Sequence, residues 1–184
     1  MAELGWAATE WPGTEHVIAT HDAAGFRADS AMILADGELA RVAYQLECGA
    51  DWGFARLDVT VTRLAGTSRL SLTRDAGGRW LVGGEPLPAL AQCVDIDINR
   101  TPLTNTLPIR RLSWAPGQAY DLDVAYISVP ELDIRPSRQR YTMLWRDDRT
   151  GEAAYRYESG TYQADLPVDA DGYVRDYPGL WQRL

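Results

Sequence analysis

The stretch from Cys93 to Leu112 (CVDIDINRTPLTNTLPIRRL) holds the residues most able to do chemistry. Asp95 and Asp97 alternate with apolar residues, so in an extended strand both carboxylates lie on one face. Arg110 and Arg111 follow in the same stretch, and each guanidinium can form paired hydrogen bonds with a carboxylate or a phosphate. Charged groups of both signs are costly to bury among isoleucine, leucine and proline unless they pair with one another or with a ligand.

Three interpretations of these charges are open. The aspartates and arginines form an internal network that fixes this segment against a sheet, or Arg110 and Arg111 hold the hydroxyls, phosphate or carboxylate of a ligand. In the third, Asp95 and Asp97 share acid and base roles, as neighbouring carboxylates do in glycoside hydrolysis. The sequence has no motif for a nucleophilic serine, a zinc pair, a phosphate loop or a dinucleotide, so no cofactor is predicted.

Between the aspartates and the arginines, the pair Thr101-Pro102 predicts one short helix or turn near residues 101–107. Threonine would cap the turn, and proline suits its first position. Pro108 lacks a backbone N–H and disfavours a helical residue before it, so we expect the turn to run only through Asn105. The elements around it must then hold the two aspartates and the two arginines in place.

Most of the remaining sequence alternates between apolar and polar residues, as strands with one buried and one wet face do. From Ala55 to Thr62, every second residue is apolar and the residues between are arginine, aspartate or threonine. Similar alternation occurs at residues 41–47, 70–72, 122–126, 141–145, 155–157 and 162–168. Turn-forming pairs lie between these runs: Asp36-Gly37, Gly77-Gly78, Pro116-Gly117 and Asp171-Gly172. The pattern predicts a mainly β fold, an antiparallel meander that curls or pairs to cover its core.

The secondary structure of two segments is less clear from the pattern. Leu39, Val42, Ala43 and Leu46 also fit helical spacing, but Asp36-Gly37 lies between two runs of matched length, which favours strands. Residues 83–90 (GGEPLPAL) are expected to form a loop, because two glycines and two prolines suit neither a ladder nor a helix. With 184 residues and no internal repeat or linker, the chain is expected to form a single domain over residues 1–184.

Composition narrows the class of partner. The net charge is −8 and the pI is about 4.7, which opposes attraction to nucleic acid or to anionic lipid headgroups. All 18 basic residues are arginine, which excludes lysine Schiff-base chemistry. His16 and His21 would project from opposite faces of a strand, so a metal pair is not expected.

The sequence has neither a run of roughly 20 apolar residues nor a basic N-terminal region followed by an apolar one. No transmembrane segment or secretion signal is therefore predicted, and a cytoplasmic location is expected. Cys48 and Cys93 are expected to be reduced and buried, because small thiols pack like apolar groups. Asp169-Ala-Asp171-Gly172 begins like a calcium loop, but Tyr173 and Val174 follow where a ligand and a turn residue should stand, so a hairpin turn is predicted.

The same stretch resembles a known family. Asp95-Ile-Asp97, and Thr101 to Leu112 with its TNTLPIRR run, are similar to the hallmark of the putative glycolipid-binding family, a family of bacterial proteins first catalogued as a domain of unknown function. Similar residues extend along most of the chain: Tyr44, Asp51-Trp52, Tyr126, Pro130, Leu132, Gln139, Tyr141, Val168-Asp169, Gly172, Val174 and Asp176 to Leu180. Gly49-Ala50 depart from the family pattern, which affects the exact loop before Asp51.

The resemblance implies a long curled antiparallel sheet, forming a β-roll or an incomplete barrel similar to bacterial lipoprotein carriers, with a glycolipid-like ligand. Seven tryptophans and nine tyrosines agree with this expectation. Their flat, amphipathic rings suit sugar rings and acyl chains as well as plain core packing.

Together these observations favour non-catalytic binding of an amphiphilic ligand, such as a glycolipid, in a cleft of the curled sheet. The expected ligand-binding residues are Asp95, Asp97, Thr104, Asn105, Arg110, Arg111, Tyr126, Gln139, Tyr141, Asp176 and Tyr177. The alternative is an enzyme that acts on a small or sugar-like substrate and uses Asp95, Asp97 or Asp176 as acid or base.

Overall fold

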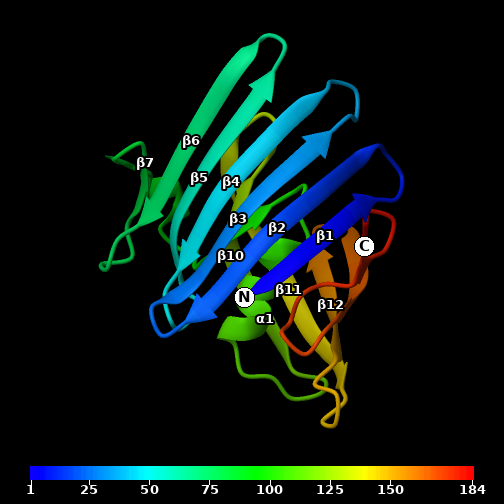
Figure 1. The fold of residues 1–184 in the computed structure, drawn as a ribbon. Helices are drawn as coiled ribbons and strands as arrows, with labels where there is room; N and C mark the ends of the chain where they lie inside the picture. The colour runs from blue at the N-terminus through cyan, green and yellow to red at the C-terminus, as the bar shows by residue number, and fades with distance from the viewer.

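A computed structural model describes residues 1–184 and folds them into two β-sheets. The larger one, which we call the long sheet, has ten strands in this order: β14 (Asp176–Tyr177), β15 (Trp181–Arg183), β1 (Ala2–Ala8), β2 (Gly13–Asp22), β3 (Gly25–Leu34), β4 (Ala40–Cys48), β5 (Phe54–Arg63), β6 (Gly66–Arg74), β7 (Trp80–Val82) and β8 (Glu85–Pro86). All neighbouring strands in it are antiparallel, and β1 to β6 form one twisted layer (Figure 1).

The second sheet, the short sheet, packs behind this layer (Figure 1). Its five strands are, in order, β13 (Tyr162–Val168), β12 (Ala153–Ser159), β11 (Ile134–Arg146), β10 (Ala119–Ile127) and β9 (Asp95–Ile98). The strand β9 runs parallel to β10, whereas the sequence pattern predicted antiparallel pairing throughout. Parallel neighbours need a crossover connection, and residues 99–118 supply it with the 3₁₀ turn η2 (Leu103–Asn105) and the helix α1 (Thr106–Arg111).

Alternation along the strands decides which side chains reach the core. On β4, Val42, Tyr44 and Leu46 are buried, while Arg41 and Gln45 between them are exposed. The strand prediction for this segment is therefore confirmed over the helical alternative. A strand places successive side chains on opposite faces, so the same rule gives every long strand one inward and one outward face.

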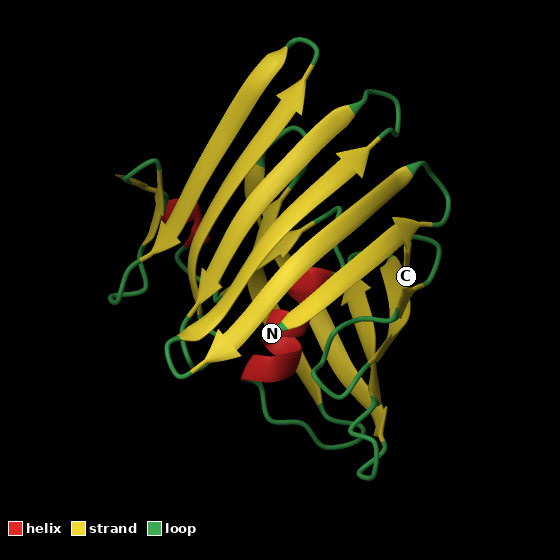
Figure 2. Ribbon diagram, in the orientation of Figure 1, coloured by secondary structure: helices red, strands yellow, loops and turns green.

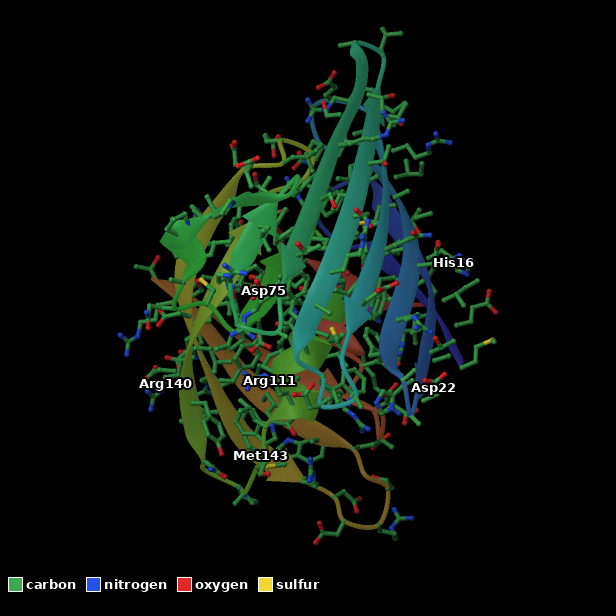
Figure 3. The ribbon with its side chains drawn as sticks, turned by 90° about the vertical axis from the view of Figure 1, so that its left-hand side faces the viewer. His16, Asp22, Asp75, Arg111, Arg140 and Met143 are labelled. Atoms are coloured by element: carbon green, nitrogen blue, oxygen red, sulfur yellow. The ribbon has the colours of Figure 1, made fainter.

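The core lies between the two sheets. Buried apolar side chains from both sheets, from η2 and from α1 form one cluster. Figure 2 shows how little of the chain is helical, with short red segments beside the yellow strands. His16 and Arg140 project from the outer faces of the long and the short sheet, whereas Arg111 lies between the sheets (Figure 3). The predicted mainly β fold, with a long curled antiparallel sheet and one short helical segment, is confirmed.

The helical segment is longer than its prolines suggested. Thr101 Oγ1 accepts a hydrogen bond of 3.0 Å from the backbone N–H of Leu103. The N-cap of η2 is nevertheless Pro102, one residue later than predicted, and no side chain caps it. The prediction that the turn runs only through Asn105 is wrong, because α1 continues through Pro108 to Arg111. Pro108 is the third residue of α1, and N–H groups of the first helical turn have no partner within the helix, so proline removes no bond there.

Residues 83–90 also differ from the prediction of a loop. Glu85–Pro86 forms β8 at the edge of the long sheet. Proline has no N–H to donate, but an edge strand can tolerate this because one of its sides has no neighbouring strand. Pro88 begins the 3₁₀ turn η1 (Pro88–Leu90), a position at which proline is favoured.

Other local predictions are confirmed. Cys48 and Cys93 are free and buried. The segment from Asp169 to Gly172 forms a turn after β13, in which Asp169 Oδ1 accepts hydrogen bonds from the backbone N–H groups of Asp171 and Tyr173. The helices are short, and none has both the length and the apolar content to cross a bilayer.

Candidate functional site

A cleft opens at the end of the short sheet where β10 ends and β11 and β13 begin. Its volume is about 340 Å³, and we call it the tyrosine cleft after the four tyrosines in its wall. The lining residues are Asp97, Ile98, Asn99, Thr101, Tyr126, Arg135, Tyr157, Ser159, Tyr162, Tyr177 and Leu180. They come from β9, the crossover, β10 to β13 and the C-terminal segment, so the cleft exists only once both sheets are assembled.

Asp97 supplies the carboxylate of this cleft. One of its oxygens accepts hydrogen bonds from Gln139 Nε2 at 2.6 Å and from Tyr157 Oη at 3.4 Å, and the other accepts one from Thr104 Oγ1 at 3.2 Å. Burial raises the pKa of Asp97, and these three hydrogen bonds oppose the rise. The side chain is thus held in one orientation while its edge still reaches the cleft.

Tyrosine rings form the wall. Tyr157, Tyr162 and Tyr177 form a triangle with ring centroids 6.2 to 6.3 Å apart. Burial raises the pKa of each of these hydroxyls, so they stay neutral and able to donate. On the other side, the Arg135 guanidinium lies 4.4 Å from the ring centroid of Tyr126, a cation–π contact at the rim.

Behind this wall lie two residues that the sequence placed in the site. Tyr141 donates a hydrogen bond of 2.8 Å to Asn105 Oδ1, and Asn105 Nδ2 donates one of 3.2 Å to the carbonyl of Pro102. Both side chains are buried, and Tyr141 packs edge-on against Tyr157 at 5.2 Å. They support the wall from inside and do not line the cleft.

Asp95 and Arg111 form an ion pair with two hydrogen bonds. Arg111 Nε and one terminal nitrogen approach the two oxygens of Asp95 at 3.0 and 2.7 Å. The Asp95 side chain is fully buried and that of Arg111 is 22% exposed. This geometry is that of the internal Arg–Asp network considered from the sequence, and it ties α1 to β9.

Arg110 points elsewhere. Its guanidinium lies 5.1 Å from the ring centroid of Trp52, a buried residue whose φ of +66° is rare for any residue other than glycine. Asp176 is exposed on β14 and does not line the tyrosine cleft, although its neighbour Tyr177 does. The structure therefore brings Asp97, Tyr126 and Tyr177 together, and it leaves Arg110 and Asp176 outside.

Sequence reasoning missed several cleft residues: Arg135, Tyr157, Ser159 and Tyr162. Tyr157 shares the inward face of β12 with Tyr155, so the strand pattern showed its direction. Its proximity to Asp97 depends on strand pairing across 60 residues, which local patterns do not show.

A buried carboxylate was also missed. Glu15 on β2 is 1% exposed and accepts hydrogen bonds from Ser30 Oγ and Tyr44 Oη, each at 2.8 Å, and from Thr101 Oγ1 at 2.6 Å. Burial raises its pKa from 4.5 to about 7, and the hydrogen bonds oppose the rise. The signal was present in the sequence, because Glu15 has the same parity as the inward residues Val17 and Ala19.

No three histidine, cysteine, aspartate or glutamate side chains lie close enough together to hold a metal ion. The fold and the tyrosine cleft place the chain among mainly β proteins in which two packed sheets form a cleft large enough for a small molecule.

The chain belongs to the putative glycolipid-binding family, whose model matches residues 3–183, as its sequence resemblance predicted. It is also similar to a DUF1089 family protein from Pseudomonas aeruginosa with a crystal structure. The two chains are 38% identical, with a TM-score of 0.85 over 97% of this chain and 95% of that one. Among curated proteins, none matches the chain.

Proposed function

We propose that this protein binds an amphiphilic molecule with a sugar-like head, of the glycolipid class, and that the tyrosine cleft holds the head. The observation that carries the proposal is the joint presence of the Asp97 carboxylate and four tyrosines around one open hollow of about 340 Å³. The description of the family, glycolipid-binding, supports the same class of ligand.

The chemistry of the lining suits a sugar. Aromatic faces pack against the C–H groups of a sugar ring, and neutral tyrosine hydroxyls both donate and accept hydrogen bonds. An ionised carboxylate accepts hydrogen bonds from hydroxyl groups, and such charge-assisted bonds are stronger than neutral ones. Asp97 offers its free acceptor positions from a fixed orientation, because Gln139 and Thr104 hold it from behind.

We assign different roles to the residues that the sequence grouped together. Asp97, Tyr126 and Tyr177 would contact the ligand, together with Tyr157 and Tyr162. A second set would hold the first in place from behind: Thr104, Asn105, Gln139 and Tyr141. Asp95 and Arg111 would brace the crossover through their ion pair.

The positions of the three aspartates favour binding over the acid–base alternative. Asp95 uses both oxygens for Arg111, and Asp176 is exposed outside the cleft. Asp97 alone reaches the hollow, whereas glycoside hydrolysis commonly uses two carboxylates that flank the scissile bond.

Octyl β-glucoside is a suitable probe, because it joins one sugar ring to an alkyl chain. Titration by NMR or calorimetry should show saturable binding to the wild type. Asp97→Asn and Tyr177→Ala should each weaken binding at least tenfold, a change of about 1.4 kcal/mol. The matched control is Asp123→Asn, an exposed aspartate on the outer face of β10, which should bind like the wild type. Thermal unfolding of each variant separates loss of binding from loss of fold.

Two results would count against the proposal. If 1-octanol binds as tightly as octyl β-glucoside, the cleft does not recognise the sugar. If all variants bind equally, the ligand sits elsewhere. Native mass spectrometry of the purified protein adds an independent measurement, since a retained lipid would give a bound mass that detergent exchange removes.

A further inference from the structure

A second cleft lies at the opposite end of the short sheet. The tyrosine cleft is near the first residues of β11 and β13, whereas this one is near their last residues, between α1 and the turn at residues 169–172. Its volume is about 130 Å³, and its wall includes Arg110, Arg146 and Tyr155. We call it the arginine cleft.

Neither arginine in this wall has an acidic partner. No carboxylate lies within 4.0 Å of the guanidinium of Arg110 or Arg146. Arg146 donates only a long hydrogen bond of 3.3 Å to Tyr155 Oη, and Arg110 rests against Trp52. Two arginines without an acidic partner therefore line one hollow of a protein whose net charge is −8, and the Arg110 guanidinium lies at its border against Trp52.

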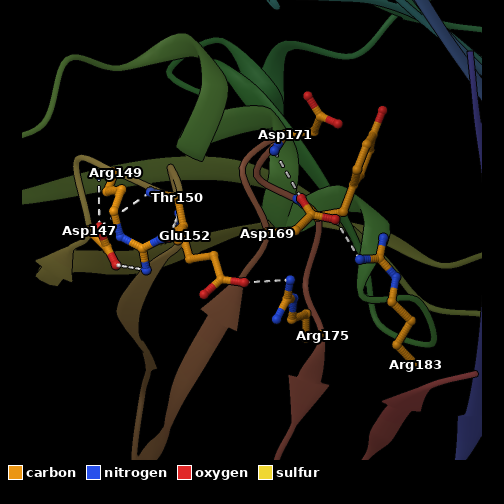
Figure 4. Close-up of polar contacts among 9 residues, drawn as sticks. Asp147, Arg149, Thr150, Glu152, Asp169, Asp171, Arg175 and Arg183 are labelled. Atoms are coloured by element: carbon orange, nitrogen blue, oxygen red, sulfur yellow. Dashed lines mark hydrogen bonds and ion pairs between the residues drawn. The ribbon is translucent and has the colours of Figure 1, made fainter.

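The nearby carboxylates are engaged by other groups, as Figure 4 shows. Asp169, which also lines the cleft, is 2.5 Å from Arg183, and Glu152 is 2.6 Å from Arg175. Asp147 accepts hydrogen bonds from the backbone N–H groups of residues 149 and 150. The carboxylate that lines the cleft, Asp169, is thus paired with Arg183, and Arg110 and Arg146 keep no acidic partner within 4.0 Å.

Tyr155 adds a neutral donor at the floor of the cleft. Its ring packs edge-on against Trp114 with centroids 5.0 Å apart, which fixes its direction. The hydroxyl oxygen accepts from Arg146, so its own hydrogen is free to donate. Burial raises the pKa of Tyr155, and the positive charges of Arg146 and Arg110 oppose that rise.

We propose that the arginine cleft is a binding site for a small oxyanion of the phosphate-ester class. Two guanidinium groups and a hydroxyl donor match the several acceptor oxygens of a phosphate, and forked N–H groups bind such oxygens in pairs. The volume suits a phosphate group with a small substituent. This site is separate from the tyrosine cleft and does not depend on the function proposed for it.

Calorimetric titration of the wild-type protein with inorganic phosphate, and then with glycerol 3-phosphate, tests the site. Both should bind saturably. Arg110→Ala and Arg146→Ala should each weaken binding at least tenfold, and Tyr155→Phe should weaken it a few fold. The control is Arg69→Ala, an exposed arginine on β6 that also lacks an acidic partner, and it should leave phosphate binding unchanged. Arg146→Lys keeps the charge without the fork and should fall between the wild type and alanine.

A vesicle experiment distinguishes a phosphate of a lipid headgroup from a free phosphate ester. Vesicles of phosphatidylcholine with and without phosphatidic acid are sedimented with the protein. Cosedimentation only with phosphatidic acid, lost in Arg110→Ala and Arg146→Ala, assigns the site to a lipid headgroup, whereas soluble probes alone assign it to a free phosphate ester.

The proposal is overturned if no probe binds, or if Arg69→Ala loses as much binding as Arg110→Ala. Octyl β-glucoside binding by Arg110→Ala should equal that of the wild type, so failure at one cleft is distinguishable from failure at the other.

Discussion

Thr101 Oγ1 and Glu15 Oε2 are joined by a buried hydrogen bond of 2.6 Å between residues 86 positions apart in the sequence. Glu15 lies on the inner face of the long sheet, and Thr101 precedes η2 and also lines the tyrosine cleft. The bond therefore ties the long sheet to the crossover that carries the cleft's polar residues. It also makes the protonation state of Glu15 part of the stability of this junction.

The first prediction concerns the dependence of stability on pH. Burial raises the pKa of Glu15 to about 7 in the folded protein, above its ordinary value of 4.5. Between these two values the folded state holds a proton that the unfolded state has released, so the free energy of unfolding falls as pH rises through this range. The contribution of Glu15 to that fall is about 3 kcal/mol. Glu15→Gln stays neutral and should lose this slope.

Urea unfolding at pH 5 and at pH 8 measures how much the free energy of unfolding falls with pH. The decrease in the free energy of unfolding between the two pH values should be smaller for Glu15→Gln than for the wild type. Glu85→Gln, an exposed residue on β8, should behave like the wild type. An unchanged slope in Glu15→Gln would show that Glu15 titrates normally in the folded protein.

The second prediction separates the two neighbouring arginines. Arg111→Ala would leave the buried carboxylate of Asp95 without its partner, which typically costs about 3–5 kcal/mol of unfolding free energy. Arg110→Ala should change stability little, because Arg110 is exposed and has no ion pair. Urea unfolding of both variants measures the difference.

A matched control for Arg111 is Arg156→Ala. Arg156 makes the same two-bond contact with Asp165, at 2.8 and 3.0 Å, but the pair is exposed on the surface. Its loss should be much smaller, since water screens an exposed pair. If Arg111→Ala were no more costly than Arg156→Ala, the Asp95 pair would not brace the crossover.

Local sequence patterns predicted the strands well and the site only in part. The alternation around Leu57 and Val59 depends on neighbouring residues alone, so it could be interpreted directly. The parallel pairing of β9 with β10 could not, because a crossover leaves no period in the sequence. The positions of Tyr157 and Tyr162 at the cleft could not be predicted either, because they depend on the pairing of strands that are distant in sequence.

For the polar residues of the helical segment, the sequence indicated that they were unusual but not which groups they contact. TNTLPIRR was singled out as unusual, and the structure buries its threonines and its asparagine with a hydrogen-bond partner for each. The sequence showed that these groups needed partners, as any buried polar group does. It did not show which partners: Thr106, for instance, donates to the carbonyl of Gly172, 66 residues away.

The third prediction compares two glycines in equivalent places. Gly25 and Gly66 each close a hairpin opposite the last residue of the preceding strand, with φ of +128° and +142°. A Cβ at Gly25 would lie 2.1 Å from the carbonyl oxygen of Cys48, whereas one at Gly66 would meet nothing within 4 Å. Gly66→Ala should therefore show backbone strain alone, about 1–3 kcal/mol.

Gly25→Ala should be less stable than Gly66→Ala by at least a further 1 kcal/mol or so, because backbone must move to relieve the overlap. Paired urea unfolding curves of the two variants give this difference directly. Equal losses would mean that β3 and β4 can separate at Cys48 without cost.

The fourth prediction concerns the two thiols. Burial raises the pKa of Cys93 to about 11 and that of Cys48 further still, with nearby aspartates adding to both shifts. At pH 8 the thiolate fraction of Cys93 is then on the order of one in a thousand, and only the thiolate is alkylated. Iodoacetamide should leave both cysteines unmodified in the native protein and modify both in concentrated guanidinium chloride, as intact mass measurements would show.

Ser68→Cys places a thiol at an exposed position of β6 and should react at the rate of a free thiol. Rapid labelling of Cys48 or Cys93 in the native protein would instead indicate that the sheets part often enough to expose the core between them.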